Sequence, residues 1–250
     1  MIPPSDDAPP GSRPGDGQFP ATRWSLVLRA RGADERAAGR ALSELCGAYW
    51  YPLYVYARRV GNGAEDAEDL TQGFFARLLE KDYFAEADQR RGRLRSFLLA
   101  SFKHYMHDEW DKSRAQKRGG GETPLSIDAA MAEERYRLEP QDKASPDVVY
   151  ERRWALTALE NFVGALRDDY AAAGKAEVFD ALQPHLTGDA EGGYAGAAEK
   201  LGISEGAARV AAHRLRKRYG EVMRREIAQT VETEDEVDDE IRTLFAALRG

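Results

Sequence analysis

The chain has 250 residues and a net charge of -7 at pH 7, with 42% hydrophobic and 32% charged residues. This length and composition fit one or two small globular domains. No stretch approaches the roughly 20 apolar residues of a membrane-spanning helix, and the N-terminus lacks the apolar core of a signal peptide. We therefore expect a soluble, cytoplasmic protein with no membrane partner.

Cys46 is the single cysteine, which leaves no intramolecular disulfide, and its apolar neighbours at helical spacing predict a buried thiol.

The N-terminal half predicts a disordered arm followed by a helical domain. Residues 1–21 form the arm, because six prolines and three glycines fall within the first 20 positions. In residues 22–115, apolar side chains recur every three or four positions and predict three helices. The first ends near Val60 before Gly61-Asn62-Gly63 and contains Pro52, which is expected to bend it. The second spans about 64–80 and the third about 94–112.

The C-terminal half predicts a linker, a second helical domain and an acidic extension. Residues 116–147 are rich in glycine and proline and indicate a linker with one short helix around 127–136. About 30 extended residues could reach on the order of 100 Å. Apolar periodicity continues through residues 148–229, and residues 230–250 form the extension. The predicted fold is therefore all-α, with two small helical domains joined by a linker.

Residues 194–219 have the pattern of a helix-turn-helix. The spacing of apolar residues from Tyr194 to Leu201 predicts an amphipathic helix. Gly202 ends this helix, and Ser204 is placed to cap the next one. The expected inner stripe of that helix is Ala208, Ala211, Leu215 and Tyr219. Basic side chains cover its other faces, which suits a DNA groove. An ordinary surface hairpin with a solvated charge run is the alternative.

Charge is unevenly distributed along the chain. Residues 90–118 carry nine Lys or Arg against three acids, and residues 205–225 carry seven against two. Residues 226–250 carry eight acids and two arginines. Two separate basic segments predict two nucleic-acid contacts, each neutralising phosphates.

Two segments together resemble a known family. The stretch YPLYVYARRVGNGAEDAEDLTQGFFARLLEKD (51–82) resembles region 2 of bacterial sigma factors, and YAGAAEKLGISEGAARVAAHRLRKRY (194–219) resembles their region 4 helix-turn-helix. Two such domains and a linker are the layout of the extracytoplasmic-function group of the sigma-70 family. The resemblance implies a transcription initiation factor that binds core RNA polymerase and promoter DNA, with no enzymatic activity, cofactor or metal. A helix-turn-helix repressor independent of polymerase is the alternative.

The resemblance also implies three sets of contact residues. The polymerase-binding set is Glu65, Asp66, Asp69 and Gln72. The set for -10 promoter DNA is Tyr83, Arg91, Arg93, Arg95, Lys103, Lys112 and Arg114. The set for the -35 element is Ser204, Arg209, His213, Arg214, Arg216, Lys217 and Arg218. Plain stabilisation of a helix dipole is the other explanation for the acids, and solvated surface charge is the other explanation for any one basic residue.

Two features lie outside the resemblance. His104 and His107 have a spacing that suits metal ligands, but no further histidine or cysteine clusters nearby, so we expect neither a metal site nor an enzyme built on it. The extension predicts a short amphipathic helix through Val237, Ile241, Leu244, Phe245 and Leu248. This helix either folds back on a basic DNA-binding surface as an inhibitor, docks on a partner, or is a solubilising cap on the last helix. The resemblance separately allows an anti-sigma factor as a partner of the protein.

Overall fold

The computed structural model describes residues 35–79, 93–115, 129–140, 143–188, 193–231 and 233–249, and these are helical with short connections. The predicted all-α class is confirmed. The helices are α2 (Glu35–Arg59), α3 (Ala64–Leu79), α4 (Leu94–Ala115), α5 (Ala129–Arg137), α6 (Pro146–Ala172), α7 (Ala176–Leu182), α8 (Ala195–Leu201), α9 (Glu205–Ala228) and α10 (Glu236–Arg249), with a 3-10 turn at Gln183–His185. The predicted arm, residues 1–21, lies outside the described residues.

The local signals in the sequence set the helix ends. α2 contains Pro52 and ends at Arg59, before Gly61 adopts a φ of 110° that favours glycine. α6 begins at a serine cap, where the backbone N–H of Val148 donates to Ser145 Oγ at 3.4 Å, and Pro146 occupies the first turn. The predicted helices at 64–80 and 94–112 are confirmed as α3 and α4.

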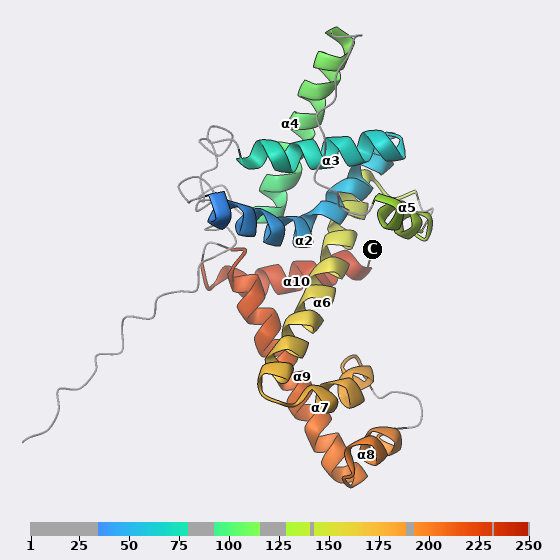
Figure 1. The fold of residues 1–250 in the computed structure, drawn as a ribbon, viewed down its shortest axis with the longest axis vertical. Coiled ribbons are helices and arrows are strands. Elements are labelled where there is room, and N and C mark those ends of the chain that lie inside the picture. The colour runs from blue at the N-terminus through green and yellow to red at the C-terminus, as the bar shows by residue number, and fades with distance from the viewer. Residues whose placement is uncertain are drawn as a thin grey trace, which may run out of the picture.

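The long helix α6 connects the two ends of the molecule (Figure 1). Helices α2 to α5 lie at one end, while α7, α8 and the start of α9 lie at the other. α6 packs against α2 and α10 and also against α7 and α9. α10 lies between the two ends, in contact with α6 and α9.

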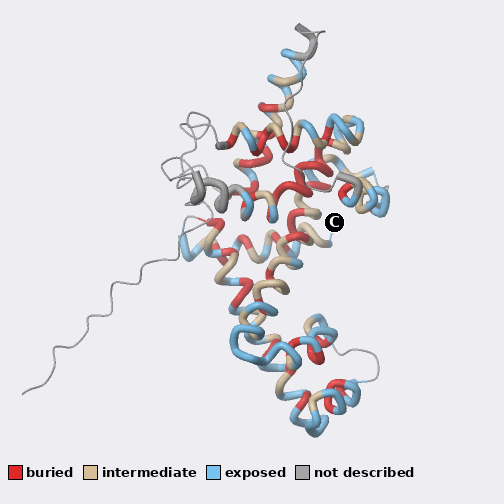
Figure 2. Tube along the Cα trace, in the orientation of Figure 1, coloured by how far each residue is buried: buried red, intermediate tan, exposed pale blue. Residues whose placement is uncertain are grey.

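The core is rich in buried aromatic side chains and is densest where α2, α3, α4 and α6 meet (Figure 2). Tyr49 and Tyr54 of α2, Phe74 of α3 and Tyr150 of α6 are at most 1% exposed. Apolar burial of this kind is the main favourable term in folding. α6, predicted to open the second domain, therefore shares its core with the first, and the division into separate domains stays a prediction.

Part of the predicted linker is packed against α2. The predicted short helix at 127–136 is confirmed as α5. The Tyr54 hydroxyl donates to Glu133 Oε2 at 2.7 Å, and the Tyr51 hydroxyl donates to Glu139 Oε1 at 2.9 Å. Burial, reinforced by these carboxylates, raises the pKa of both tyrosines above its usual value. Residues 129–140 thus follow the surface of α2 in this structure.

A close contact between α3 and α4 predicts a compensating pair of mutations. A Cβ atom at Gly73 would overlap the Tyr105 hydroxyl oxygen. We expect Gly73→Ala to lower the free energy of unfolding by about 1–3 kcal/mol, because the contact is overpacked. In a Tyr105→Phe background, where the nearest remaining ring atom is 3.4 Å away, the same change should cost much less. Urea unfolding of the four proteins measures this coupling, and equal costs in both backgrounds would contradict the packing described.

Candidate functional site

The helix-turn-helix is formed by α8, its turn and the first half of α9. Gly202 ends α8 with φ 63° and ψ 33°, a left-handed conformation that glycine adopts without strain. Ser204 then caps α9, its Oγ accepting from the backbone N–H of Ala207 at 3.2 Å. Tyr194, Ala197 and Ala198 are buried as predicted. The turn and the cap together fix the direction in which α9 leaves α8.

The inner stripe of α9 differs from the predicted one at two positions. Ala208 and Leu215 are fully buried as expected, but Ala212 is buried while Ala211 and Tyr219 are only partly so. The buried face continues through Val222, Met223 and Ile227. The difference arises because α9 packs against α6 as well as against α7 and α8.

The outer face of α9 carries most of the predicted -35 set. Arg209, His213, Arg214 and Lys217 are exposed, as is the capping Ser204. The guanidinium carbon of Arg209 lies 5.7 Å from the centre of the Tyr194 ring. Val210, which the sequence analysis missed, is 52% exposed among these basic residues. An exposed apolar side chain in this position suits a thymine methyl group.

Two members of the -35 set are already engaged within the protein. Arg216 is partly buried and donates to the Tyr194 hydroxyl at 3.1 Å. Arg218 pairs with Asp169 of α6 and with Glu221, at 2.9 Å in each case. Partial burial opposes ionisation of Asp169, but hydrogen bonds from Arg218 and Arg225 outweigh it and lower the pKa of that carboxyl. Arg216 is thus less available to DNA than the exposed residues, and Arg218, although 45% exposed, is held in two ion pairs.

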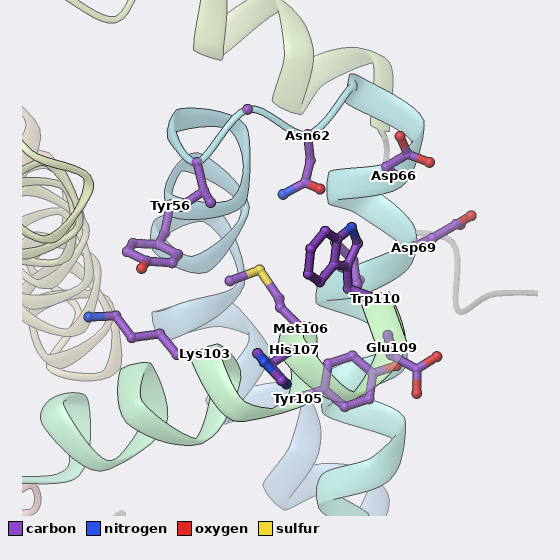
Figure 3. A pocket seen from close by; sticks show the side chains of 13 residues that line it. Tyr56, Asn62, Asp66, Asp69, Lys103, Tyr105, Met106, His107, Glu109 and Trp110 are labelled. Carbon is purple, nitrogen blue, oxygen red and sulfur yellow. The ribbon is translucent and has the colours of Figure 1, made fainter. Parts of the chain in front are cut away.

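The predicted polymerase-binding acids lie beside a groove. Glu65, Asp66 and Asp69 are exposed on α3. Asp66 and Asp69 line one rim of a cavity of about 890 Å³, with Trp110 of α4 and Val60 also contributing (Figure 3). Trp110 is 57% exposed and Val60 51% exposed. The groove therefore combines exposed apolar surface with carboxylates at its edge.

Gln72 does not join these acids. Its side chain is 7% exposed, and its Nε2 donates to Glu68 Oε1 at 2.7 Å. Its Oε1 is buried without a hydrogen-bond partner among the described residues. Burial also raises the pKa of Glu68. Gln72, predicted to bind polymerase together with Asp69, therefore does not share the exposed surface of Asp69, because α3 turns Gln72 inward.

The members of the predicted -10 set that the structure describes pair with the protein's own carboxylates. Tyr83 and Arg91 lie outside the described residues, as does the side chain of Arg114. Lys112 pairs with Glu109 within α4 at 2.7 Å. Lys103 pairs with Asp147 at the start of α6, and this hydrogen bond raises the pKa of Lys103. Arg93 pairs with Glu240 of α10 at 2.9 Å.

Arg95 is the clearest correction to the predicted -10 set. Its side chain is 4% exposed, pairs with Glu240, and donates from Nε to Glu151 Oε2 at 2.6 Å. Burial lowers its pKa, but the two carboxylates outweigh that effect and hold the pKa above its usual value. Its guanidinium also lies 4.6 Å from the centre of the Trp154 ring. Arg95 cannot contact a phosphate in this conformation.

Among the described residues no group of three or more His, Cys, Asp or Glu side chains is placed to hold a metal ion. His107 lies 3.4 Å from Asp111 instead. Cys46 is partly buried, and burial raises the pKa of its thiol to about 12. No helix in the described part of the chain is both long and apolar enough to cross a membrane.

Comparisons with known proteins do not place this chain in a family. No family model matches it, and neither a curated protein nor a solved structure does.

Two glycine substitutions in the helix-turn-helix should change the stability of the protein in opposite directions. Gly202→Ala should destabilise the protein by about 1 kcal/mol, because a Cβ atom is strained at its positive φ. Gly220→Ala, in the middle of α9 with no atom within 4 Å of the new Cβ, should stabilise it by about 0.5–1 kcal/mol. Thermal unfolding measures both. Two changes of the same sign would contradict the conformation of the turn.

Proposed function

We propose that this protein is a transcription initiation factor of the sigma type, which binds core RNA polymerase through α3 and reads promoter DNA through α9. The observation that carries the proposal is the pairing, in one chain, of an exposed basic face on a capped helix-turn-helix with an exposed acidic groove at the other end. A DNA-binding module alone would not need the second surface. The promoter sequence and the activating signal are separate questions.

The groove on α3 suits a helical partner that bears arginines. Its carboxylates, Asp66 and Asp69, lie on its rim, and Trp110 and Val60 provide apolar area beside them. Grooves of this kind bind amphipathic helices, with apolar anchors in the groove and charge pairs at the edge. A solvated acidic face would not need an exposed tryptophan next to it.

The outer face of α9 suits the major groove of DNA. A capped second helix presents its first turns to base edges in a helix-turn-helix. Arg209 and Arg214 are exposed there and can each donate two hydrogen bonds to guanine. Lys217, further along, is better placed for phosphates.

The first functional prediction concerns polymerase binding. Asp66→Ala/Asp69→Ala should weaken binding of the purified protein to core RNA polymerase by about tenfold or more, because charge pairs at the rim would be lost. Glu177→Ala/Asp180→Ala removes two exposed acids from α7 and should leave binding unchanged. Co-elution on a sizing column and a titration of labelled protein measure both. If the wild type fails to bind core polymerase yet binds a palindromic duplex, the protein is a repressor instead.

The second functional prediction concerns DNA sequence. After binding sequences have been selected from a random duplex library, Arg209→Ala and Arg214→Ala should each relax preference at one base pair, at a cost of about 1–3 kcal/mol. Lys175→Ala removes an exposed lysine outside α8 and α9 and should change nothing. A uniform loss across all sequences would make the arginine a phosphate contact.

A further inference from the structure

The start of α4 is covered by carboxylates from distant parts of the chain. Glu240 of α10 pairs with Arg93 and Arg95, although 145 residues separate it from Arg95. The Glu240 side chain is 1% exposed. Arg93 also donates to Thr243 Oγ1 at 3.1 Å, one turn further along α10. α10 is thus fixed to α4 by a polar contact at its centre.

α10 rests on the core through one apolar face that also carries Glu240. Val237 and Leu244 are buried on that face, and Ile241, Ala247 and Leu248 are partly buried against the core. Phe245, which the predicted amphipathic helix also included, is 40% exposed. α10 follows α9 through a short connection, where the Thr230 carbonyl accepts from the backbone N–H of Leu94 at 3.5 Å. α10 packs mainly against α6 and α9, so its movement would uncover the start of α4 while the contacts between α2, α3 and α4 remain.

α10 leaves the outer face of the helix-turn-helix open. Its contact with α9 is at the far end of that helix, where Asp238 pairs with Arg224. Arg209, His213 and Arg214 are exposed in the first half of α9, and α9 starts beside α8, away from α10 (Figure 1). The acidic extension therefore covers one of the two predicted DNA-binding surfaces and not the other.

We propose that α10 is a removable clasp, a carboxylate-bearing helix that occupies the arginines at the start of α4 in the free protein and competes there with nucleic-acid phosphates. Carboxylates and phosphates both accept paired hydrogen bonds from guanidinium groups, so they exclude each other at Arg93 and Arg95. The identity of the competitor rests on the proposed function, but the clasp itself rests on the ion pairs alone.

The test compares two variants that remove the same charge from the same helix. Glu240→Gln keeps the shape of the side chain but breaks the buried pairs, while Glu151 still faces Arg95. Asp239→Asn is the control, since Asp239 is 54% exposed and pairs only with Arg242 among the contacts of its carboxylate in the described chain. Hydrogen exchange of the full-length proteins follows residues 94–100 and 236–249, and fluorescence anisotropy measures binding to a labelled 30-nucleotide single-stranded DNA of mixed sequence.

We expect Glu240→Gln to speed amide exchange in both segments by about tenfold or more, leaving α8 and the start of α9 unchanged, and to tighten DNA binding on the order of tenfold relative to Asp239→Asn. Equal behaviour of the two variants would overturn the proposal. Faster exchange throughout the protein would also overturn it, since α10 would then be a part of the fold that cannot leave separately. Faster exchange in these two segments without tighter DNA binding would show that α10 does not compete with nucleic acid for the arginines. None of these measurements involves polymerase. A failure of the proposed function would appear in the polymerase-binding experiment and can be told apart from a failure of the clasp.

Discussion

The arrangement of this protein depends on the buried guanidinium of Arg95. Three elements meet there, since α4 supplies the arginine, α6 supplies Glu151 and the Trp154 ring, and α10 supplies Glu240. The Tyr150 hydroxyl adds a hydrogen bond to the Arg95 carbonyl at 3.0 Å. Burying these charges is costly, so the pairs contribute little net stability compared with apolar packing, but removing one partner costs about 3–5 kcal/mol. The contact therefore specifies which helices meet more than it strengthens their packing.

The basic side chains at the two ends of the molecule differ in how far they are paired with carboxylates. At the helix-turn-helix end, Arg209, His213, Arg214 and Lys217 are exposed, whereas Arg216 donates to the Tyr194 hydroxyl, and Arg218 and Arg225 pair with Asp169 of α6. At the other end, Asp147, Glu151 and Glu240 neutralise the basic residues of α4. Under the proposed function, α10 would keep the arginines at the start of α4 covered until nucleic acid displaces it. α10 holds them through buried ion pairs from Glu240, beside an apolar face that packs on the core.

Local features were predictable from the sequence, and distant contacts were not. Apolar spacing predicted α2, α3, α4 and α10, and Gly202 with Ser204 predicted the turn of the helix-turn-helix, because these signals act within a few residues. The burial of Arg95 was not predictable, since its partners lie 56 and 145 residues away and an arginine in a basic segment suggests an exposed surface. Gln72 and Ala212 were missed for a related reason: rotation of a helix about its axis depends on which neighbours it packs against.

The most direct test of this account is a distance measurement by pulsed electron paramagnetic resonance. Spin labels at Ala100→Cys on α4 and Ala246→Cys on α10, both exposed sites, would be introduced in a Cys46→Ala background. The account predicts a single narrow distance in the free protein and a longer, broader distribution after addition of excess 30-nucleotide single-stranded DNA, whose phosphates compete with Glu240 for Arg93 and Arg95. The same narrow distance in the DNA complex would contradict it.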